Sequence, residues 1–179
     1  LSSIKASNEL LIENKIKSRN KKLLFSNIIK DLDRMNRLIS DISNYTRTQI
    51  EVEKQKFNKF ELIEFIEELR LSFQQNKKKI NIFFNQSNQK IIVHANINKL
   101  AQVFINLIEN AISFSPEKSS ILIQLTKEKN RAIILLADQG CGIIKKSKDK
   151  IFERFYTDRS RANNYHTGLG LSISKKIME

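Results

Sequence analysis

The sequence predicts an α+β protein of two domains. A helical hairpin is expected over residues 1–56, and a layered domain, with helices on one face of a mostly antiparallel sheet, over residues 57–179. Two observations predict this division. Residues 1–56 contain no Gly and no Pro, and their apolar side chains recur at helical spacing. After Phe57, short β-rich runs alternate with amphipathic helical segments, which is the order of elements in an α+β layer domain.

The N-terminal segment predicts two antiparallel helices. Its apolar residues recur in alternating steps of four and three, which makes a heptad seam of Ile28, Leu32, Met35, Ile39 and Ile42. A shorter helix over residues 1–16 precedes a turn near residues 18–20, and the long helix continues to about residue 54. Two helices do not bury so long a seam, so a second copy of the hairpin would complete a four-helix bundle. The alternative is that the seam packs against the rest of the chain.

The elements of the second domain follow from periodicity and from turn residues. Asn96 is a candidate helix cap, and the helix after it must end before Ser115-Pro116. Residues 127–130 are turn-forming and separate two apolar runs, which predicts a β-hairpin. Helices are expected at residues 62–75, 97–114 and 168–179, and strands at 80–84, 91–94, 121–125 and 132–137.

The four glycines form two G-x-G pairs, Gly140 with Gly142 and Gly168 with Gly170. Glycine is used where the backbone turns through positive φ or approaches a ligand without a Cβ in the way. The first pair follows a strand that ends at Asp138, and the second opens a helix, where free backbone N–H groups favour phosphate. One such pair is equally well explained as a turn or a cap. Two pairs in these positions indicate a ligand.

The helix before Ser115 carries a polar stripe at Asn106, Glu109 and Asn110. Asn106 and Asn110 share one face, although Asn is a poor helix former. Their amide oxygens would hold a hydrated Mg²⁺ ion, which keeps most of its waters and needs few protein ligands. The alternative is that both are solvated polar residues on an amphipathic helix.

Four stretches together resemble the N, G1, F and G2 boxes of bacterial two-component sensor histidine kinases in residue types, order and spacing. They are N-L-I-E-N-A (106–111), D-Q-G-C-G-I (138–143), F-E-R-F-Y (152–156) and T-G-L-G-L-S-I (167–173). The hairpin resembles the dimerisation and phosphotransfer domain of that family, and residues 57–179 resemble its GHKL-type ATP-binding domain, a Bergerat-type α/β sandwich. The glycine boxes alone would also suit gyrase, Hsp90 or MutL relatives, whereas F-E-R-F-Y and the heptad hairpin favour the kinases.

The resemblance implies a role for each motif residue. Asp138 would accept a hydrogen bond from the adenine amino group. Asn110 and Asn106 would coordinate Mg²⁺ between the phosphates, and Glu109 would be the catalytic residue that orients or activates the attacking group. The other nucleotide-binding residues would be Gly140, Gly142, Ile143, Phe155, Tyr156, Thr167, Gly168, Leu169, Gly170 and Leu171. The expected cofactors are therefore ATP and Mg²⁺.

The implied activity is transfer of the ATP γ-phosphoryl group to a histidine and then to an aspartate of a response regulator. The expected partners are a second copy, bound through residues 1–56, and the receiver domain of a response regulator. The parent protein would be anchored in the inner membrane, with this part in the cytoplasm. The longest apolar run, residues 132–137, is far shorter than the ~20 residues of a bilayer-spanning helix.

The sequence departs from the family pattern in two ways. The H-E-x-x-x-P stretch that carries the family's acceptor histidine is absent, and neither His94 nor His166 stands in such a context. The chain also ends inside the helix after Gly170, where relatives continue for two more strands, so truncation at both ends is expected. Autophosphorylation of this chain is not expected, and a non-catalytic ATP-binding dimerisation or scaffold module is the alternative.

The formal charge of +13 raises a third hypothesis, a nucleic-acid-associated ATPase of the MutL or gyrase type. The lysines are scattered along the chain, there is no tryptophan, and no known nucleic-acid-binding motif is present. We therefore expect no nucleic-acid partner. The single cysteine, Cys141, excludes an internal disulfide and fits a reducing compartment.

Overall fold

The computed structural model describes residues 25–29, 31–32, 35, 39, 56–86, 89–157 and 167–179. The chain divides into two compact units, Leu1–Thr48 and Gln49–Glu179. The predicted boundary at residue 57 stays a prediction, because the residues before Lys56 lie outside the described part of the second unit.

The first unit is helical wherever it is described, at residues 25–29, 31–32, 35 and 39. Within the predicted seam, Ile28 and Met35 are half-buried, whereas Leu32 and Ile39 are 47% and 63% exposed. A single copy of the chain therefore leaves part of the seam in contact with solvent. The predicted first helix, the turn after it and Ile42 lie outside the described residues.

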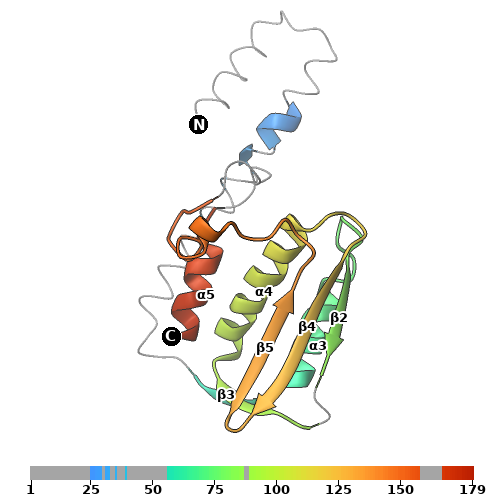
Figure 1. The fold of residues 1–179 in the computed structure, drawn as a ribbon, viewed down its shortest axis with the longest axis vertical. Helices are drawn as coiled ribbons and strands as arrows, with labels where there is room; N and C mark the ends of the chain where they lie inside the picture. The colour runs from blue at the N-terminus through green and yellow to red at the C-terminus, as the bar shows by residue number, and fades with distance from the viewer. Residues whose placement is uncertain are drawn as a thin grey trace, which may run out of the picture. The chain divides into compact units, whose positions relative to one another are not determined.

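The described part of the second unit contains two sheets and three α-helices, shown in Figure 1. Strands β1 (Asn58–Glu61) and β3 (Ile92–Ala95) form an antiparallel pair. In the other sheet, β4 (Ser120–Glu128) pairs in parallel with β2 (Asn81–Asn85) and antiparallel with β5 (Arg131–Ala137). The helices are α3 (Leu62–Ser72), α4 (Ile97–Phe114) and α5 (Gly170–Met178), with a 3₁₀ turn, η2, at Lys145–Ser147.

The α+β class, the mostly antiparallel pairing and the β4–β5 hairpin are confirmed, but the prediction of a single sheet is wrong. The described strands form two sheets rather than one, and β2 pairs with β4 in parallel. Strand β1 was not predicted, because its sequence N-K-F-E has one apolar residue and shows no alternating pattern.

Helices α3 and α4 lie on one face of the three-stranded sheet, and α5 packs beside α4 (Figure 1). Alternate residues of β4 point to opposite faces, so Ile121, Ile123 and Leu125 are buried, whereas Leu122 is exposed. Burial of each such side chain contributes about 1.5–3 kcal/mol. The core also contains Leu62, Phe65 and Ile66 of α3, Ile82 of β2, and Phe104, Ile108 and Ala111 of α4.

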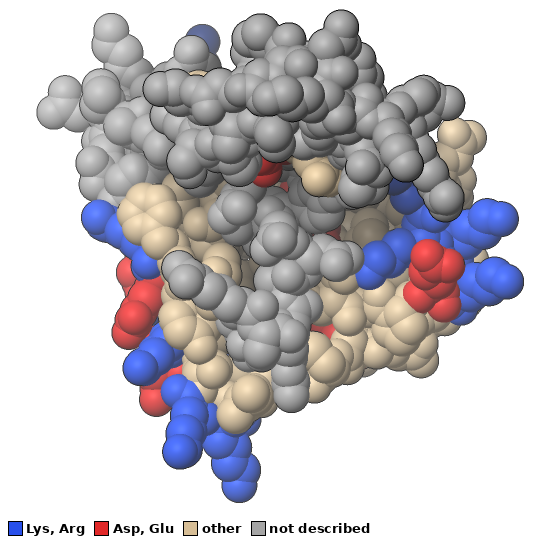
Figure 2. Space-filling model, turned by 90° about the horizontal axis from the view of Figure 1, so that it is seen from above, with Lys and Arg blue, Asp and Glu red and all other residues tan. Residues whose placement is uncertain are grey.

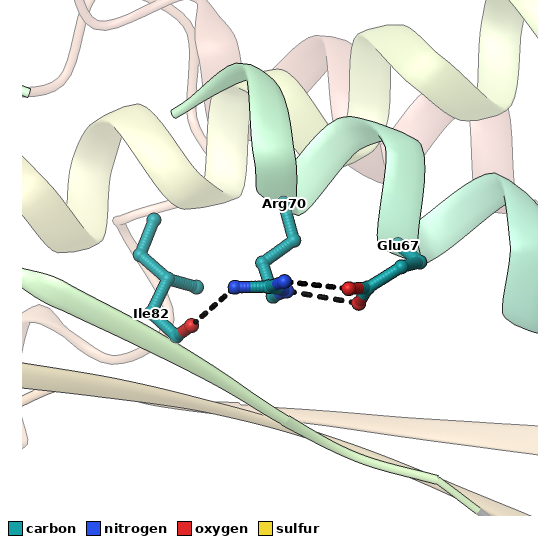
Figure 3. Close-up of polar contacts among 3 residues, drawn as sticks. All are labelled: Glu67, Arg70 and Ile82. Atoms are coloured by element: carbon teal, nitrogen blue, oxygen red, sulfur yellow. Dashed lines mark hydrogen bonds and ion pairs between the residues drawn. The ribbon is translucent and has the colours of Figure 1, made fainter. Parts of the chain in front are cut away.

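Arg70 joins α3 to the edge strand β2 (Figure 3). Its guanidinium forms two hydrogen bonds with the Glu67 carboxylate, of 2.8 and 2.5 Å, and donates a third, of 3.2 Å, to the carbonyl of Ile82. The hydrogen bonds from Arg70 hold the pKa of Glu67 below its usual value, and those same bonds raise the pKa of Arg70. The two-point contact lies within α3 and orients the guanidinium, and the single bond to the Ile82 carbonyl links α3 to the sheet.

Helix α4 is held at both ends, which matters because it carries the predicted polar stripe. The Asn96 side chain accepts from the backbone N–H of Lys99 at 3.0 Å, which confirms the predicted cap. At the other end, the Lys78 ammonium donates to the carbonyls of Ser113 and Ser115 at 2.5 and 2.8 Å. A cation at this end also interacts favourably with the helix dipole.

Candidate functional site

Helix α4 is in contact with both glycine pairs. A Cβ on Gly140 would stand 3.1 Å from the carbonyl oxygen of Phe114, at the C-terminal end of α4. A Cβ on Gly170 would stand 3.4 Å from the side-chain carbon Cγ of Asn106, two turns earlier. The two positions are about 12 Å apart along the helix axis. Both glycine pairs therefore lie against α4, the helix that carries the polar stripe.

The loop after β5 is shaped by its own side chains. The Asp138 carboxylate is exposed and accepts from the backbone N–H of Gly140 at 2.7 Å. Gln139 accepts from the N–H of Ser120 at 3.0 Å, which ties the loop to the first residue of β4. A carboxylate has about four acceptor positions, so one hydrogen bond leaves Asp138 able to accept from a ligand donor.

The F-E-R-F-Y stretch is joined to the second glycine pair at Phe155. The backbone N–H of Phe155 donates to the carbonyl of Gly168 at 2.9 Å. Both residues have positive φ, 62° for Phe155 and 73° for Gly168. A Cβ on Gly168 would stand 2.6 Å from the carbonyl carbon of Phe155, so no larger residue fits without a shift of the backbone.

Tyr156 adds a second link, because its hydroxyl donates to the Ser147 hydroxyl at 2.8 Å. This contact connects the F-E-R-F-Y stretch to η2, which follows the first glycine pair. Phe152 and Phe155 are 42% and 61% exposed, and Ile143 is also exposed. The chain between residues 157 and 167, expected to form a lid over the ligand, lies outside the described residues.

Helix α5 begins beside this contact. Leu169 is buried, and its N–H donates to the Thr167 hydroxyl at 3.3 Å. Gly170 is the first residue of α5, and Leu171 is half-buried in its first turn. The N–H groups of a first helical turn have no partner within the helix, and the helix dipole favours negative charge there.

The residues of the polar stripe on α4 differ in their contacts and exposure. The Asn106 amide donates to the carbonyl of Gly170 at 3.1 Å and to the Ser174 hydroxyl at 3.3 Å. Asn110, one turn later, is half-buried, and Glu109 is exposed. Sequence reasoning missed Ser174 and the contact of Asn106 with α5. The spacing of Gly170 and Ser174, one turn apart on α5, is the only sequence signal for that contact.

The site fits a magnesium nucleotide in its donor types. Among the described residues there is no group of three His, Cys, Asp or Glu side chains that could hold a metal ion. Mg²⁺ does not need such a group, because it accepts one or two protein oxygens with water and phosphate oxygens. Asn110 would supply such an oxygen, whereas the Asn106 amide donates its hydrogen bonds to α5.

The match to known proteins agrees with this geometry. Residues 95–179 match the family model described as histidine kinase-, DNA gyrase B-, and HSP90-like ATPase. The sensor protein ChvG of Rhizobium meliloti (strain 1021) is 36% identical over 170 residues, which is 89% of this chain and 30% of ChvG. The sensor histidine kinase WalK of Bacillus subtilis (strain 168) is 29% identical over 156 residues, which is 83% of this chain and 25% of WalK. The chain belongs to the sensor histidine kinases.

Solved structures of this kinase family agree in fold. The catalytic domain of histidine kinase ThkA has a TM-score of 0.63 and 33% identity, over 69% of this chain and 80% of that domain. ThkA in complex with the response regulator protein TrrA has a TM-score of 0.74 and 26% identity, over 99% of this chain and 50% of that one. The second unit is therefore a GHKL-type α/β ATP-binding domain. The kinase chain spans about a third of the length of its sensor-protein relatives.

The charge distribution of the kinase chain does not form one basic patch on the face in Figure 2. Among the residues described there, Lys and Arg side chains lie at the margins with Asp and Glu between them. Lys145, Lys146 and Lys148, which follow the first glycine pair, are exposed. Their charges attract an anionic ligand to this end of the domain. None of the described helices of this kinase chain is long and apolar enough to cross a membrane.

Proposed function

We propose that this chain is the dimerisation and ATP-binding core of a histidine kinase that transfers the γ-phosphoryl group of ATP to a histidine. The observation that carries the proposal is the contact of both glycine pairs with α4, through Phe114 at one end and Asn106 at the other. In this arrangement Asp138 reads the adenine amino group, and the first turn of α5 faces the phosphates. A site with a carboxylate at one end and the first turn of a helix at the other suits a purine nucleotide.

The residues of the chain act by positioning and by neutralising charge. Asn110 holds Mg²⁺, and the backbone N–H groups of residues 168–171 hold the phosphates. Glu109 is exposed on the same helix, so it can reach a group that attacks from the solvent side. When bound, MgATP supplies the phosphoryl group. A neutral imidazole is nucleophilic enough to accept it once the two are aligned, so alignment accounts for most of the rate.

We further propose that the chain is a homodimer through its helical unit. Leu32 and Ile39 are 47% and 63% exposed, and they lie on one heptad seam. Burial of such a seam against a second copy removes this apolar surface from water. The acceptor of the phosphoryl group after the histidine is a response regulator, a partner that ThkA has in its solved complex. The parent protein is anchored in the inner membrane, and this part is cytoplasmic.

The test is calorimetric titration of the 179-residue chain with ATP, with and without Mg²⁺. Binding that Mg²⁺ strengthens is expected. If neither titration gives heat or displaces a fluorescent nucleotide, the proposal is refuted.

The proposed phosphotransfer is to be distinguished from ATP binding without phosphotransfer. The two functions separate when a histidine-bearing acceptor hairpin is supplied in trans with labelled ATP. Labelled acceptor supports the kinase, and its absence despite ATP binding supports the scaffold.

A further inference from the structure

Asn106 is oriented by two acceptors on α5, and this orientation bears on its role. The carbonyl of Gly170 can only accept, so it is the amide nitrogen of Asn106 that faces it. Ser174 is buried, and its hydroxyl donates to the same carbonyl at 2.9 Å while it accepts from Asn106 at 3.3 Å. Asn106, Gly170 and Ser174 thus form a closed set of three hydrogen bonds, two between the helices and one within α5.

The first turn of α5 depends on this set, because it has little local support. Leu169 stands at the N-cap position and provides no side-chain cap. The local contact there is the 3.3 Å bond from the Leu169 N–H to Thr167. Gly170 lies directly beside Asn106, since a Cβ there would be in ordinary van der Waals contact with the Asn106 side chain at 3.4 Å.

We propose that Asn106 is a positioning residue, which fixes the first turn of α5 against α4 and thereby aims the backbone N–H groups that receive the phosphates. This inference rests on the nucleotide-binding function proposed above. It separates Asn106 from Asn110, although the sequence pattern treats them alike. Asn110 acts on Mg²⁺ directly, and Asn106 acts on the nucleotide through α5.

Substitution by Asp distinguishes a positioning residue from a metal ligand, because the two roles predict opposite results. A carboxylate is a better Mg²⁺ ligand than an amide, so Asp at a ligand position retains or strengthens binding of MgATP. At position 106 a carboxylate would instead face the Gly170 carbonyl, which can only accept, and would push the helix end away. The Ser174 hydroxyl could donate to the carboxylate only by giving up its own bond to Gly170.

The experiment compares ATP affinity of the wild-type chain, Asn106→Ala, Asn106→Asp and Asn110→Asp, each with and without Mg²⁺. For Asn106→Ala we expect a loss of about tenfold, equal in both conditions, since the hydrogen bonds removed do not involve the metal. Asn106→Asp loses more than Asn106→Ala, whereas Asn110→Asp keeps its response to Mg²⁺. The proposal is overturned if Asn106→Asp binds MgATP as tightly as wild type, or if the loss in Asn106→Ala occurs only with Mg²⁺.

A second measurement needs no nucleotide. A double-mutant cycle on thermal unfolding combines Asn106→Ala with Ser174→Ala, and Ser172→Ala is the matched control because its hydroxyl bonds only within α5, to Leu169. We expect the cost of the pair with Ser174 to be less than additive, and that with Ser172 to be additive. If the costs are additive for both serines and the wild-type chain still binds ATP, the positioning role of Asn106 is overturned but the proposed function is not. Failure of the wild-type chain to bind ATP refutes the proposed function and the effect on the nucleotide, while the cycle still reports the contact.

Discussion

Gly168 and Gly142 offer a test of how much the crowding at Phe155 contributes to stability. Both glycines have positive φ, 73° and 69°. A Cβ on Gly142 would meet nothing within 4 Å, whereas a Cβ on Gly168 would stand 2.6 Å from the Phe155 carbonyl carbon and 2.8 Å from the Tyr156 carbonyl oxygen. The pair of alanine substitutions therefore separates backbone strain, which both share, from steric overlap, which only one has.

The expected magnitudes follow from these distances. Placing Ala in the left-handed region costs about 1–2 kcal/mol, so Gly142→Ala should lose that much. In Gly168→Ala the overlap is with backbone, which cannot rotate away, and forced shifts of this kind cost about 1–3 kcal/mol more. For Gly168→Ala the two costs add to a loss of about 2–5 kcal/mol in the free energy of unfolding. The loss has an upper bound, because the hydrogen bond between Phe155 and Gly168 can break and let the two segments move apart locally.

The assay is thermal and urea unfolding of the wild-type chain, Gly142→Ala and Gly168→Ala, followed by circular dichroism. Gly170→Ala serves as the control, because a Cβ there has room and Ala is favoured over Gly within a helix by roughly 0.5–1 kcal/mol. We expect Gly168→Ala to lose at least about 1 kcal/mol more than Gly142→Ala. Equal losses in the two variants would refute the argument from crowding and leave backbone conformation as the whole effect.

Three further results are expected. Asp138→Asn should weaken ATP binding by about tenfold to a hundredfold without loss of stability. The new amide oxygen can still accept within the loop, whereas its NH₂ group faces the adenine donor. Unchanged affinity in calorimetry would contradict the adenine role. Glu67→Gln should lower the free energy of unfolding by at most about 1 kcal/mol above about pH 5. Because Arg70 lowers the pKa of Glu67, this difference should vanish as the pH falls through that pKa. A pH-independent difference in urea unfolding would argue against the ion pair. Leu32→Asp should shift the chain from dimer to monomer in sedimentation velocity, whereas Ile29→Asp, equally exposed but off the seam, should not; a dimer that survives Leu32→Asp would place the interface elsewhere.

The elements that sequence reasoning predicted well are those whose pattern is long and has clear ends. Helix α4 follows this rule, since Asn96 caps it and Ser115-Pro116 stops it, and the structure ends the helix at Phe114. The β4–β5 hairpin has apolar runs on both sides of a turn and was also found. Strand β1 was missed because four mostly polar residues carry no period, and its pairing with β3 comes from contacts distant in sequence. The parallel pairing of β2 with β4 is likewise set by tertiary packing, which local patterns do not encode.

At the candidate site, sequence reasoning identified the right residue types but not what each one touches. The glycines were assigned on the assumption that a missing Cβ makes room for a ligand. In the structure two of the four make room for the protein itself, Gly140 for the end of α4 and Gly168 for the backbone of Phe155. Such contacts join segments far apart in the sequence, and neither glycine spacing nor composition predicts them.

This distinction changes what a G-x-G pair means in this domain. Within each pair, one glycine is required by a close contact inside the protein, and the other either adopts positive φ in open space, as Gly142 does, or lets a side chain approach, as Gly170 does for Asn106. The first kind holds the site together before any ligand binds, so its loss should reduce stability and affinity together. The second kind adjusts the site locally, so its loss should change affinity more than stability. The four alanine variants thus sort the glycines by the ratio of the change in ATP affinity to the change in stability. A ratio that is the same for all four would mean that the glycines share a single role.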